Sequence, residues 1–428
     1  MTQGGVQALF DRLDPGIVRC PYGLYDSFRE DPPRYVDEVD AVVLTRFDDV
    51  QRVISDAKTF SSAQVRGPVS LAAMGEVLGA LAASDPEMAG LMEKNTFMTR
   101  FLLAADGEDH RRRRSLVQKA FTPRRIRTME PMIESAVDRL IDGFASRGTV
   151  EFVSEFAIPL PIEVIAHAIG VEGADVADFK RWSDGLFAPM GVNKPSPEIM
   201  IEFLRSQDDF IGYFGPRIDE RRDSPRDDLL QDLLGAEEDG ERLSRAESLL
   251  MCAELTAAGN ETTTSMLTSA LVILGQDPDL ADRLRADPSQ IPAFIEEVLR
   301  LEGPIQAFYR TATSDVEVGG LSVEAGTAIL CIYGAANRDP AQFHSPTEVD
   351  CQRDNIKTHL SFGRGPHACV GSLLARTEGQ IAVARILERL QGIEVTHAPA
   401  DGEYTPSYML RGGHHLDLSF RAAVPSGG

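Results

Sequence analysis

The sequence predicts a mainly α-helical fold with a minor β-sheet, and two kinds of pattern carry this prediction. Apolar residues recur at intervals of three and four in several long segments, as on the buried face of a helix. These segments are residues 123–144, 198–222, 244–274 and 291–301. Strand-forming residues also gather in short runs, several of them bounded by glycine. These runs are residues 41–44, 316–318, 328–332 and 415–420.

Two further segments, residues 61–101 and 183–205, are apolar but weakly patterned. Segments of this kind often cover an active site, although plain surface loops and short helices give the same pattern. Proline and glycine are scattered along the chain, and no repeat or low-complexity tract divides it. Length alone favours two or three domains for 428 residues.

The composition narrows the class of protein. The 43 basic and 66 acidic residues give a net charge of −23, which opposes binding to nucleic acids and to anionic membranes. Residues 1–16 lack the pattern of a signal peptide, and no apolar run is long enough to span a bilayer. The five cysteines are an odd number at irregular spacing, which favours a reducing compartment over a disulfide framework. We therefore expect a soluble, cytoplasmic protein.

The most informative segment of the sequence surrounds Cys369. Gly363, Gly365 and Pro366 allow a tight loop before it, and residues 373–387 are expected to form a helix just after it. The dipole and free amides of a helix N-terminus stabilise a thiolate, which should lower the pKa of the thiol. Because thiolates ligate metals, Cys369 is a candidate metal ligand. The alternative is that Cys369 is a buried structural cysteine in a glycine-rich turn.

The pattern Phe362-x-x-Gly365-x-x-x-Cys369-x-Gly371 closely resembles the haem-binding loop of the cytochrome P450 family. The resemblance implies haem b as the cofactor, with Cys369 as the axial ligand of its iron. It also implies a single compact domain over residues 1–428, with the haem between a long central helix and the loop and helix of residues 359–376. The residues that it assigns to haem binding in this region are Phe362, Gly363, His367, Cys369, Gly371 and Ala375.

The helix predicted near the middle of the chain contains the unusual run AGNETT at residues 258–263. Glycine inside a helix costs about 1 kcal/mol relative to alanine, and threonines are poor helix formers. By resemblance this run is an oxygen-binding groove, in which Ala258 and Gly259 leave room for O2 while Glu261 and Thr262 relay protons. Cleavage of O2 consumes protons, which a paired acid and alcohol can deliver. A polar patch in a core helix is the alternative.

Glu297 and Arg300 lie three residues apart on the predicted helix 291–301, so their side chains share one face. Such a pair on its own is usually a solvated helix surface. The P450 family has the same Glu-x-x-Arg pair and a later arginine that meets it, for which Arg353 is the match. The resemblance therefore implies a structural trio that holds together the region behind the cysteine loop.

His110 and Arg114 share a helix face at a spacing of four residues. The resemblance implies that they bind the haem propionates together with Arg310 and His367, because cationic and donor groups are the expected partners of carboxylates. A surrounding basic cluster would steer an acidic electron donor to the side of the haem that carries the thiolate. For Arg111, Arg112 and Arg113 the alternative is that they are ordinary solvated charges. The cluster comprises Arg111, Arg112, Arg113, Lys119, Arg124 and Arg125.

Together the motifs imply a monooxygenase that inserts one oxygen atom into a hydrophobic small molecule such as a steroid, terpenoid, lipid or polyketide. The chain carries no flavin or ferredoxin module, so the electrons are expected from a separate ferredoxin and its reductase. A peroxide-driven oxygenase or isomerase, a haem sensor or carrier, and a metal site of His359, His367 and Cys369 are the alternatives. The expected substrate contacts are Leu255, Ala258, Ile305, Phe308 and Met409, and we expect a monomer.

Overall fold

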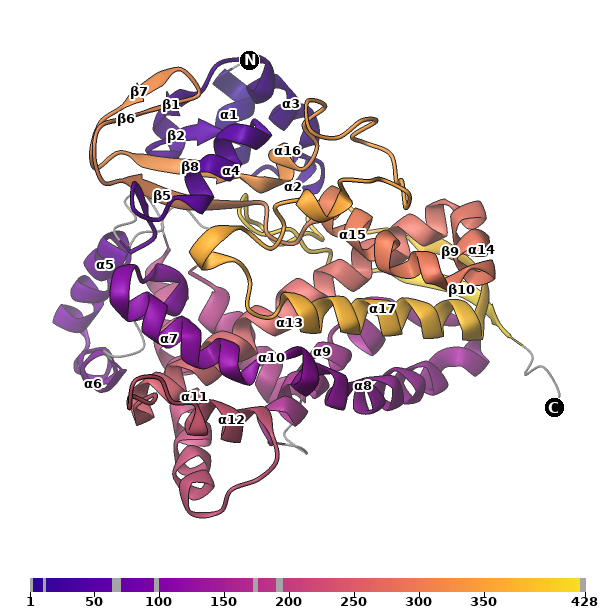
Figure 1. Ribbon diagram of the computed structural model, residues 1–428, viewed down its shortest axis with the longest axis horizontal. Coiled ribbons are helices and arrows are strands. Elements are labelled where there is room, and N and C mark those ends of the chain that lie inside the picture. Colours follow the sequence, from indigo (N-terminus) through magenta and orange to yellow (C-terminus); the bar gives the residue numbers. More distant parts are fainter. Residues whose placement is uncertain are drawn as a thin grey trace.

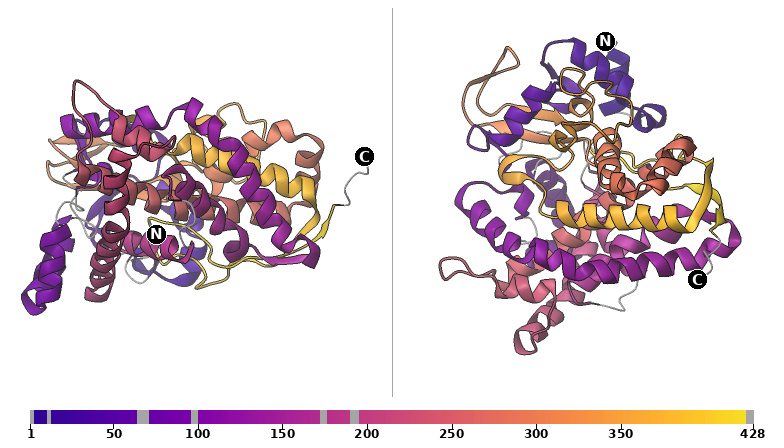
Figure 2. Two further views of the ribbon diagram at one scale, coloured as in Figure 1. Left: turned by 90° about the horizontal axis from the view of Figure 1, so that it is seen from below. Right: turned by 45° about the vertical axis from the view of Figure 1, so that its right-hand side comes forward.

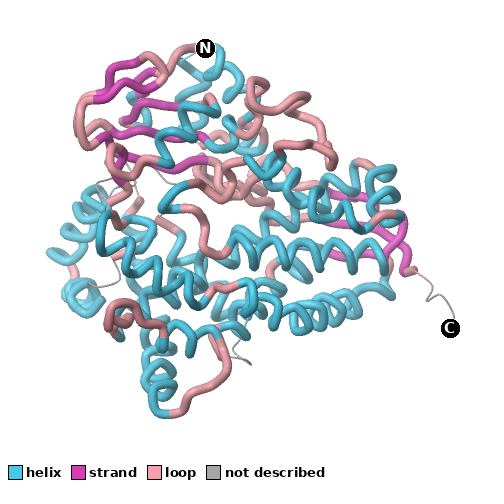
Figure 3. The backbone as a smooth tube through the Cα atoms, viewed as in Figure 1, coloured by secondary structure: helices cyan, strands magenta, loops and turns pink. Residues whose placement is uncertain are grey.

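The chain forms a sheet-rich lobe at one end and a larger helical lobe (Figure 1). The computed structural model describes residues 3–10, 13–63, 71–95, 100–171, 176–189 and 195–423. A tube view shows strands gathered in the sheet-rich lobe and again in a smaller sheet near the C-terminus (Figure 3). The two lobes form one compact domain, so the mainly α fold predicted from the sequence is confirmed, and the motifs rightly overruled the expectation from length.

The larger sheet joins the beginning of the chain to its second half. Its strand order is β1-β2-β8-β5-β3, in which β2 runs parallel to β8 and the other pairs are antiparallel. Its strands are β1 (Arg34–Val36), β2 (Ala41–Leu44), β3 (Phe60–Ser61), β5 (Ala307–Ala312) and β8 (Ala328–Ile332). The hairpin of β6 (Val316–Val318) and β7 (Leu321–Val323) and five short helices complete this lobe. These helices are α1 (Gln3–Phe10), α2 (Pro15–Arg19), α3 (Tyr22–Glu30), α4 (Phe47–Ser55) and α16 (Tyr333–Ala336).

The helical lobe holds most of the buried apolar side chains. Its helices are α5 (Leu71–Ser84), α6 (Pro86–Asn95), α7 (Gly107–Ala120), α8 (Pro123–Phe144), α9 (Pro159–Ala168), α10 (Val176–Phe187), α11 (Pro197–Asp223), α12 (Leu229–Gly235), α13 (Arg245–Gln276), α14 (Pro278–Ala286), α15 (Ile291–Glu302) and α17 (Ser372–Arg389). Helices α8 and α17 run alongside each other (Figure 2). A second sheet, ordered β4-β10-β9, consists of β4 (Thr149–Glu151), β9 (Leu390–His397) and β10 (Asp417–Ala422).

The longest described helix, α13, lies at the centre of the helical lobe. It begins with a capping box, in which Ser244 Oγ accepts the Glu247 N–H and the Glu247 carboxylate accepts the Ser244 N–H. It packs against α9, α10, α11, α15 and α17, so most of its turns are buried. Between residues 246 and 275 of this helix, Ala258 is the exposed residue.

The helices predicted from periodicity agree with the structure to within two residues at each end. The strand predicted at residues 415–420 is displaced, because β10 begins at Asp417. The weakly patterned segment 61–101 contains α5 and α6, and the segment 183–205 contains the end of α10 and the start of α11. Within these segments, residues 64–70, 96–99 and 190–194 lie outside the described residues. No helix in the described ranges combines the length and the apolar character needed to cross a membrane.

Candidate functional site

The loop before Cys369 depends on two glycines with left-handed backbone angles. Gly363 has a φ of 64° and Gly365 a φ of 68°, a region that side chains with a Cβ rarely adopt. A Cβ on Gly365 would also come within 3.0 Å of the backbone of Ser55 at the end of α4. The Cys369 N–H donates to the Phe362 carbonyl at 2.7 Å and closes the loop. The predicted tight turn is therefore confirmed.

Cys369 lies three residues before the start of α17. The amides of Gly371 and Ser372 donate to its sulfur, and the guanidinium groups of Arg114 and Arg376 lie near enough to act on its charge. These groups act in the expected direction, but burial has the larger effect and raises the pKa of the free thiol. The expectation of a lowered pKa is therefore wrong for the thiol without a metal. A coordinating thiol is deprotonated outright by the ion it binds.

The Cys369 thiol is both surrounded by protein and accessible. Burial raises its pKa, yet the residue keeps an exposed surface. On α13, Ala258 is likewise exposed, and a Cβ on Gly259 would meet no atom within 4 Å. An exposed thiol and small residues on α13 would leave room for a large flat group such as haem b, which Cys369 would hold by its sulfur.

His110, Arg114 and His367 supply polar groups near the same loop. The rings of His110 and His367 lie 4.1 Å apart between centroids, and Arg114 lies near the Cys369 sulfur. Arg114 Nε is buried and has no hydrogen-bond partner among the described residues. Burial, His367 and Arg114 together lower the pKa of His110 to about 4. A partly buried guanidinium whose Nε has no partner among the described residues, beside two imidazoles, fits the carboxylates of a haem.

Arg310 makes its contacts elsewhere. Its side chain is buried, Nη1 donates to the Tyr309 carbonyl at 2.7 Å, and the guanidinium bonds the Tyr333 hydroxyl. The described contacts therefore do not join Arg310 to the pair of histidines, and its assignment to the propionates stays a prediction.

Asp106 belongs to the site, but the sequence did not single it out. Its carboxylate accepts from Ser61 Oγ at 2.5 Å and from the amides of Ser62 and Ala63 at 3.0 Å, and it lies 3.4 Å from His367 Nε2. Burial raises the pKa of Asp106, but these bonds outweigh it and hold the pKa at about 2. An aspartate just before a helix is usually interpreted as an N-cap. Asp106 occupies that position before α7, but its side chain makes no capping hydrogen bond to the helix.

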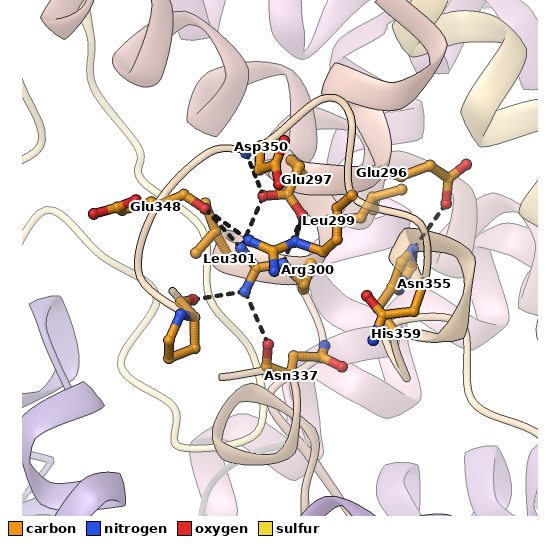
Figure 4. A network of polar contacts seen from close by, with 12 residues as sticks. Glu296, Glu297, Leu299, Arg300, Leu301, Asn337, Glu348, Asp350, Asn355 and His359 are labelled. Atoms are coloured by element: carbon orange, nitrogen blue, oxygen red, sulfur yellow. Dashed lines mark hydrogen bonds and ion pairs between the residues drawn. The ribbon is translucent and has the colours of Figure 1, made fainter. Parts of the chain in front are cut away.

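Glu297 and Arg300 meet in the buried network of Figure 4, and Arg353 binds the same Glu297 carboxylate. Arg300 Nε and Nη2 donate to the two Glu297 oxygens at 2.6 and 2.8 Å, and Arg353 Nε donates to the same carboxylate at 3.1 Å. Arg300 also bonds the carbonyls of Asn337, Pro346 and Glu348. The alternative of a solvated helix pair is wrong, because the side chains of Glu297 and Arg300 have no exposed surface.

Glu296, the residue before this pair, connects α15 to the cysteine loop. Its carboxylate binds His359 Nε2 at 2.8 Å and Arg376 Nη2 at 2.9 Å, the first of which Figure 4 shows. Burial lowers the pKa of His359, and His359 Nδ1 accepts the Ser361 N–H at 3.2 Å, so the ring is neutral and Nε2 carries the proton. Both nitrogens of His359 are thus occupied, which argues against a metal site made with His367 and Cys369.

The expected substrate contacts separate into two groups. Leu255 lies one turn before Ala258 on α13. Ile305, two residues before β5, and Phe308 within β5 are partly exposed. Met409 is instead buried in the core of the sheet-rich lobe. Its neighbour Leu410 pairs with Ile305 through a backbone bridge.

Most of the basic cluster is paired with carboxylates. Arg113 is buried and donates to Asp109 Oδ2 at 2.7 Å, so the alternative of a solvated charge is wrong for this residue. Arg112, Lys119 and Arg125 also form ion pairs. Arg111 and Arg124 are exposed, and Arg111 has one distant ion pair at 3.9 Å.

Comparison with known proteins identifies the family. The model of the family described as Cytochrome P450 matches residues 68–400. Cytochrome P450 107B1 of Saccharopolyspora erythraea is 36% identical over 96% of this chain and 98% of its own length. The 6-deoxyerythronolide B hydroxylase of that organism is 32% identical over 93% of this chain and 95% of its own length. The solved complex of P450BioI with an acyl carrier protein carrying hexadec-9Z-enoic acid has a TM-score of 0.83 at 30% identity. The match covers 95% of this chain and 99% of that chain. The chain belongs to the cytochrome P450 family, and it is a monooxygenase that uses haem b and O2.

Proposed function

We propose that this P450 binds haem b through Cys369 and oxidises a hydrophobic small molecule with electrons from a separate ferredoxin. The observation that carries the proposal is the exposed Cys369 just before α17, with the amides of Gly371 and Ser372 donating to its sulfur. Bound there, the haem supplies the activation of O2, by which one oxygen atom enters a C–H or C=C bond and the other leaves as water.

The residues around the loop hold the cofactor. The amides of Gly371 and Ser372 stabilise the sulfur as an anion. His110, Arg114 and His367 bind the propionates, with Arg310 as a further candidate. Phe362, Gly363 and Ala375 are assigned to contacts with the ring through the family resemblance.

Glu261 and Thr262 handle protons on α13. Thr262 Oγ1 donates to the Ala258 carbonyl at 2.6 Å, which fixes the hydroxyl beside the smallest residues of the helix. The oxygen keeps its lone pairs for accepting a proton, and Glu261 is the neighbouring acid that supplies it. Ala258 and Gly259 leave the space in which O2 is held.

The substrate is proposed to be a lipid or a polyketide-like molecule. Leu255, Ile305, Phe308 and Met409 are apolar, and Leu410, which bridges to Ile305, joins them from the C-terminal loop. A relative named Polyketide biosynthesis cytochrome P450 PksS and the complex of P450BioI with a carrier protein bearing hexadec-9Z-enoic acid support this class. A monomer in the cytoplasm completes the proposal.

The spectrum of the reduced carbon monoxide complex tests the thiolate. The native enzyme should give the strongly red-shifted Soret band, and Cys369→Ser should abolish it because a hydroxyl does not replace the thiolate. Cys20→Ser is the matched control, since Cys20 is exposed far from the loop in sequence, and it should keep the band. Retention of the band in Cys369→Ser would overturn the proposal.

Turnover separates the electron source from the peroxide alternative. Product formation with NAD(P)H, a ferredoxin and its reductase is the expected result. Product formation with peroxide alone would favour the peroxide-driven oxygenase instead. Spectral titration of the ferric enzyme with polyketide and fatty-acyl ligands then reports which class binds near the haem.

A further inference from the structure

A line of polar side chains connects the surface to Glu261 on α13. Thr405 Oγ1 lies 3.4 Å from Glu261 Oε1, and His414 Nε2 lies 3.3 Å from the same Thr405 oxygen. His414 is exposed, whereas Thr405 and Glu261 are partly buried. Each of the three groups can carry or exchange a proton.

The backbone of the C-terminal loop holds these side chains in place. The Thr405 N–H donates to the Gly412 carbonyl at 2.9 Å, and the His414 N–H donates to the Glu403 carbonyl at 2.8 Å. Gly412 lies directly against α13, where a Cβ would collide with Ser265 Oγ. The missing side chain therefore lets the loop approach the helix closely enough for Thr405 to reach Glu261.

We propose that His414 and Thr405 form a proton path from solvent to Glu261. The inference rests on the proposed role of Glu261 and Thr262 in proton delivery. In one transfer, the Nε2 proton of His414 moves to Thr405 Oγ1 while the hydroxyl proton of Thr405 moves to Glu261 Oε1. His414 then regains a proton from water, and Glu261 passes its proton on towards Thr262, so no proton is created or lost.

The other charged groups around the loop have different partners. His397 Nε2 binds Glu403 at 2.8 Å, and His415 Nε2 binds Asp417 at 3.0 Å and faces Glu151 at 3.7 Å through Nδ1. Among the described residues, His414 is the histidine whose ring contacts Thr405. The path therefore runs through one imidazole.

Spectroscopy of His414 tests the contacts without turnover. In ¹⁵N-histidine-labelled holoenzyme, held as the diamagnetic reduced carbon monoxide complex, His414→Gln identifies the resonances of this ring. Thr405→Val should shift the Nε2 resonance, because valine keeps the shape but removes the hydroxyl. Thr405→Ser should leave it near the native position, and Thr396→Val, outside the path, should leave it unchanged. An unshifted resonance in Thr405→Val would overturn the proposal.

Coupling of electrons to product tests the path in the working enzyme. Thr405→Val and His414→Gln should each raise peroxide release per NAD(P)H several-fold, and Thr405→Ser should restore native coupling. If Thr262→Ala uncouples the enzyme but Thr405→Val does not, the path is wrong and the role of Thr262 stands. If Thr262→Ala itself leaves coupling unchanged, the proposed function of the α13 pair fails as well.

Discussion

Glu378 is the clearest case of a single residue at odds with its surroundings. It lies on α17, is 3% exposed, and its Oε2 has no hydrogen-bond partner among the described residues. Burial without a partner raises its pKa to about 8. The carboxyl therefore stays protonated in the folded protein over a range in which the unfolded chain has released the proton.

We predict that Glu378→Gln stabilises the protein increasingly as the pH rises from 5 to 8. A raised carboxyl pKa means that the folded state binds more protons than the unfolded state in this range, so native stability falls with pH. The gain from the substitution should approach about 4 kcal/mol at pH 8 as an upper limit. Denaturant titration at both pH values measures it. Glu388→Gln on the same helix, where the side chain is 64% exposed, should show no such trend.

Single residues also show where reasoning from sequence succeeded and where it did not. Gly363 and Gly365 were found because their left-handed angles have a local signature. Asp106 was missed because its partners, Ser61 and His367, lie 45 and 261 residues away. The direction of the Cys369 pKa was wrong because local sequence reveals the helix amides but not the depth of burial.

Among the secondary-structure elements, α15 carries two adjacent acids that hold different parts of the chain. Glu297 meets Arg300 and Arg353, while Glu296 meets His359 and the Arg376 side chain of α17. One helix thereby fixes both the segment before the cysteine loop and the helix after it.

We predict that Glu297→Gln destabilises the protein by roughly 3–5 kcal/mol, because it leaves the two buried guanidinium groups without their counter-charge. Denaturant unfolding and haem retention on heating measure the effect. Glu220→Gln is the control, since Glu220 and Arg226 form a pair with both side chains more than half exposed, and it should cost less than about 1 kcal/mol. Equal effects of the two substitutions would contradict the prediction.

Elements with strong local signals were predicted well. Helix α8 was found residue for residue because Thr122 caps its N-terminus, Pro123 follows, and apolar residues repeat along its face. The bounds of helix α5 could not be predicted because its alanines, glycines and leucines show little helical periodicity. Strand β10 was displaced by two residues because pairing with β4 and β9 sets its limits.

At the scale of the whole molecule, the distribution of charge bears on the electron donor. Most of the basic cluster is neutralised by carboxylates, which leaves Arg124 exposed near the start of α8 and Arg111 nearly free on α7. These two residues, rather than the whole cluster, are expected to attract an acidic donor.

We predict that Arg124→Glu lowers the rate of ferredoxin-dependent reduction at low salt, and that the difference from the native enzyme shrinks as salt is added. Stopped-flow reduction by ferredoxin measures the rate. Arg205→Glu on α11, where the side chain is 58% exposed, is the control, and this variant should be reduced at the native rate. An equal loss of reduction rate in both variants would mean that the net charge of the protein, and not the position of Arg124, sets the rate.

The sheet topology could not be read from the sequence. Strands β2 and β8 were both predicted, but their parallel pairing joins Leu44 to Cys331. No local pattern specifies a partner at that distance, because any apolar strand can pair with any other until the rest of the fold selects one.

That pairing has a consequence during synthesis. About 290 residues separate Leu44 from its partner, so a ribosome adding 5–20 residues per second needs roughly 15–60 s to deliver it. Throughout that interval the first strands of the nascent chain have an open edge, and Phe10 and Tyr25 lack the Tyr408 that later covers them. Fragments that end before β8 should therefore be the ones that chaperones retain.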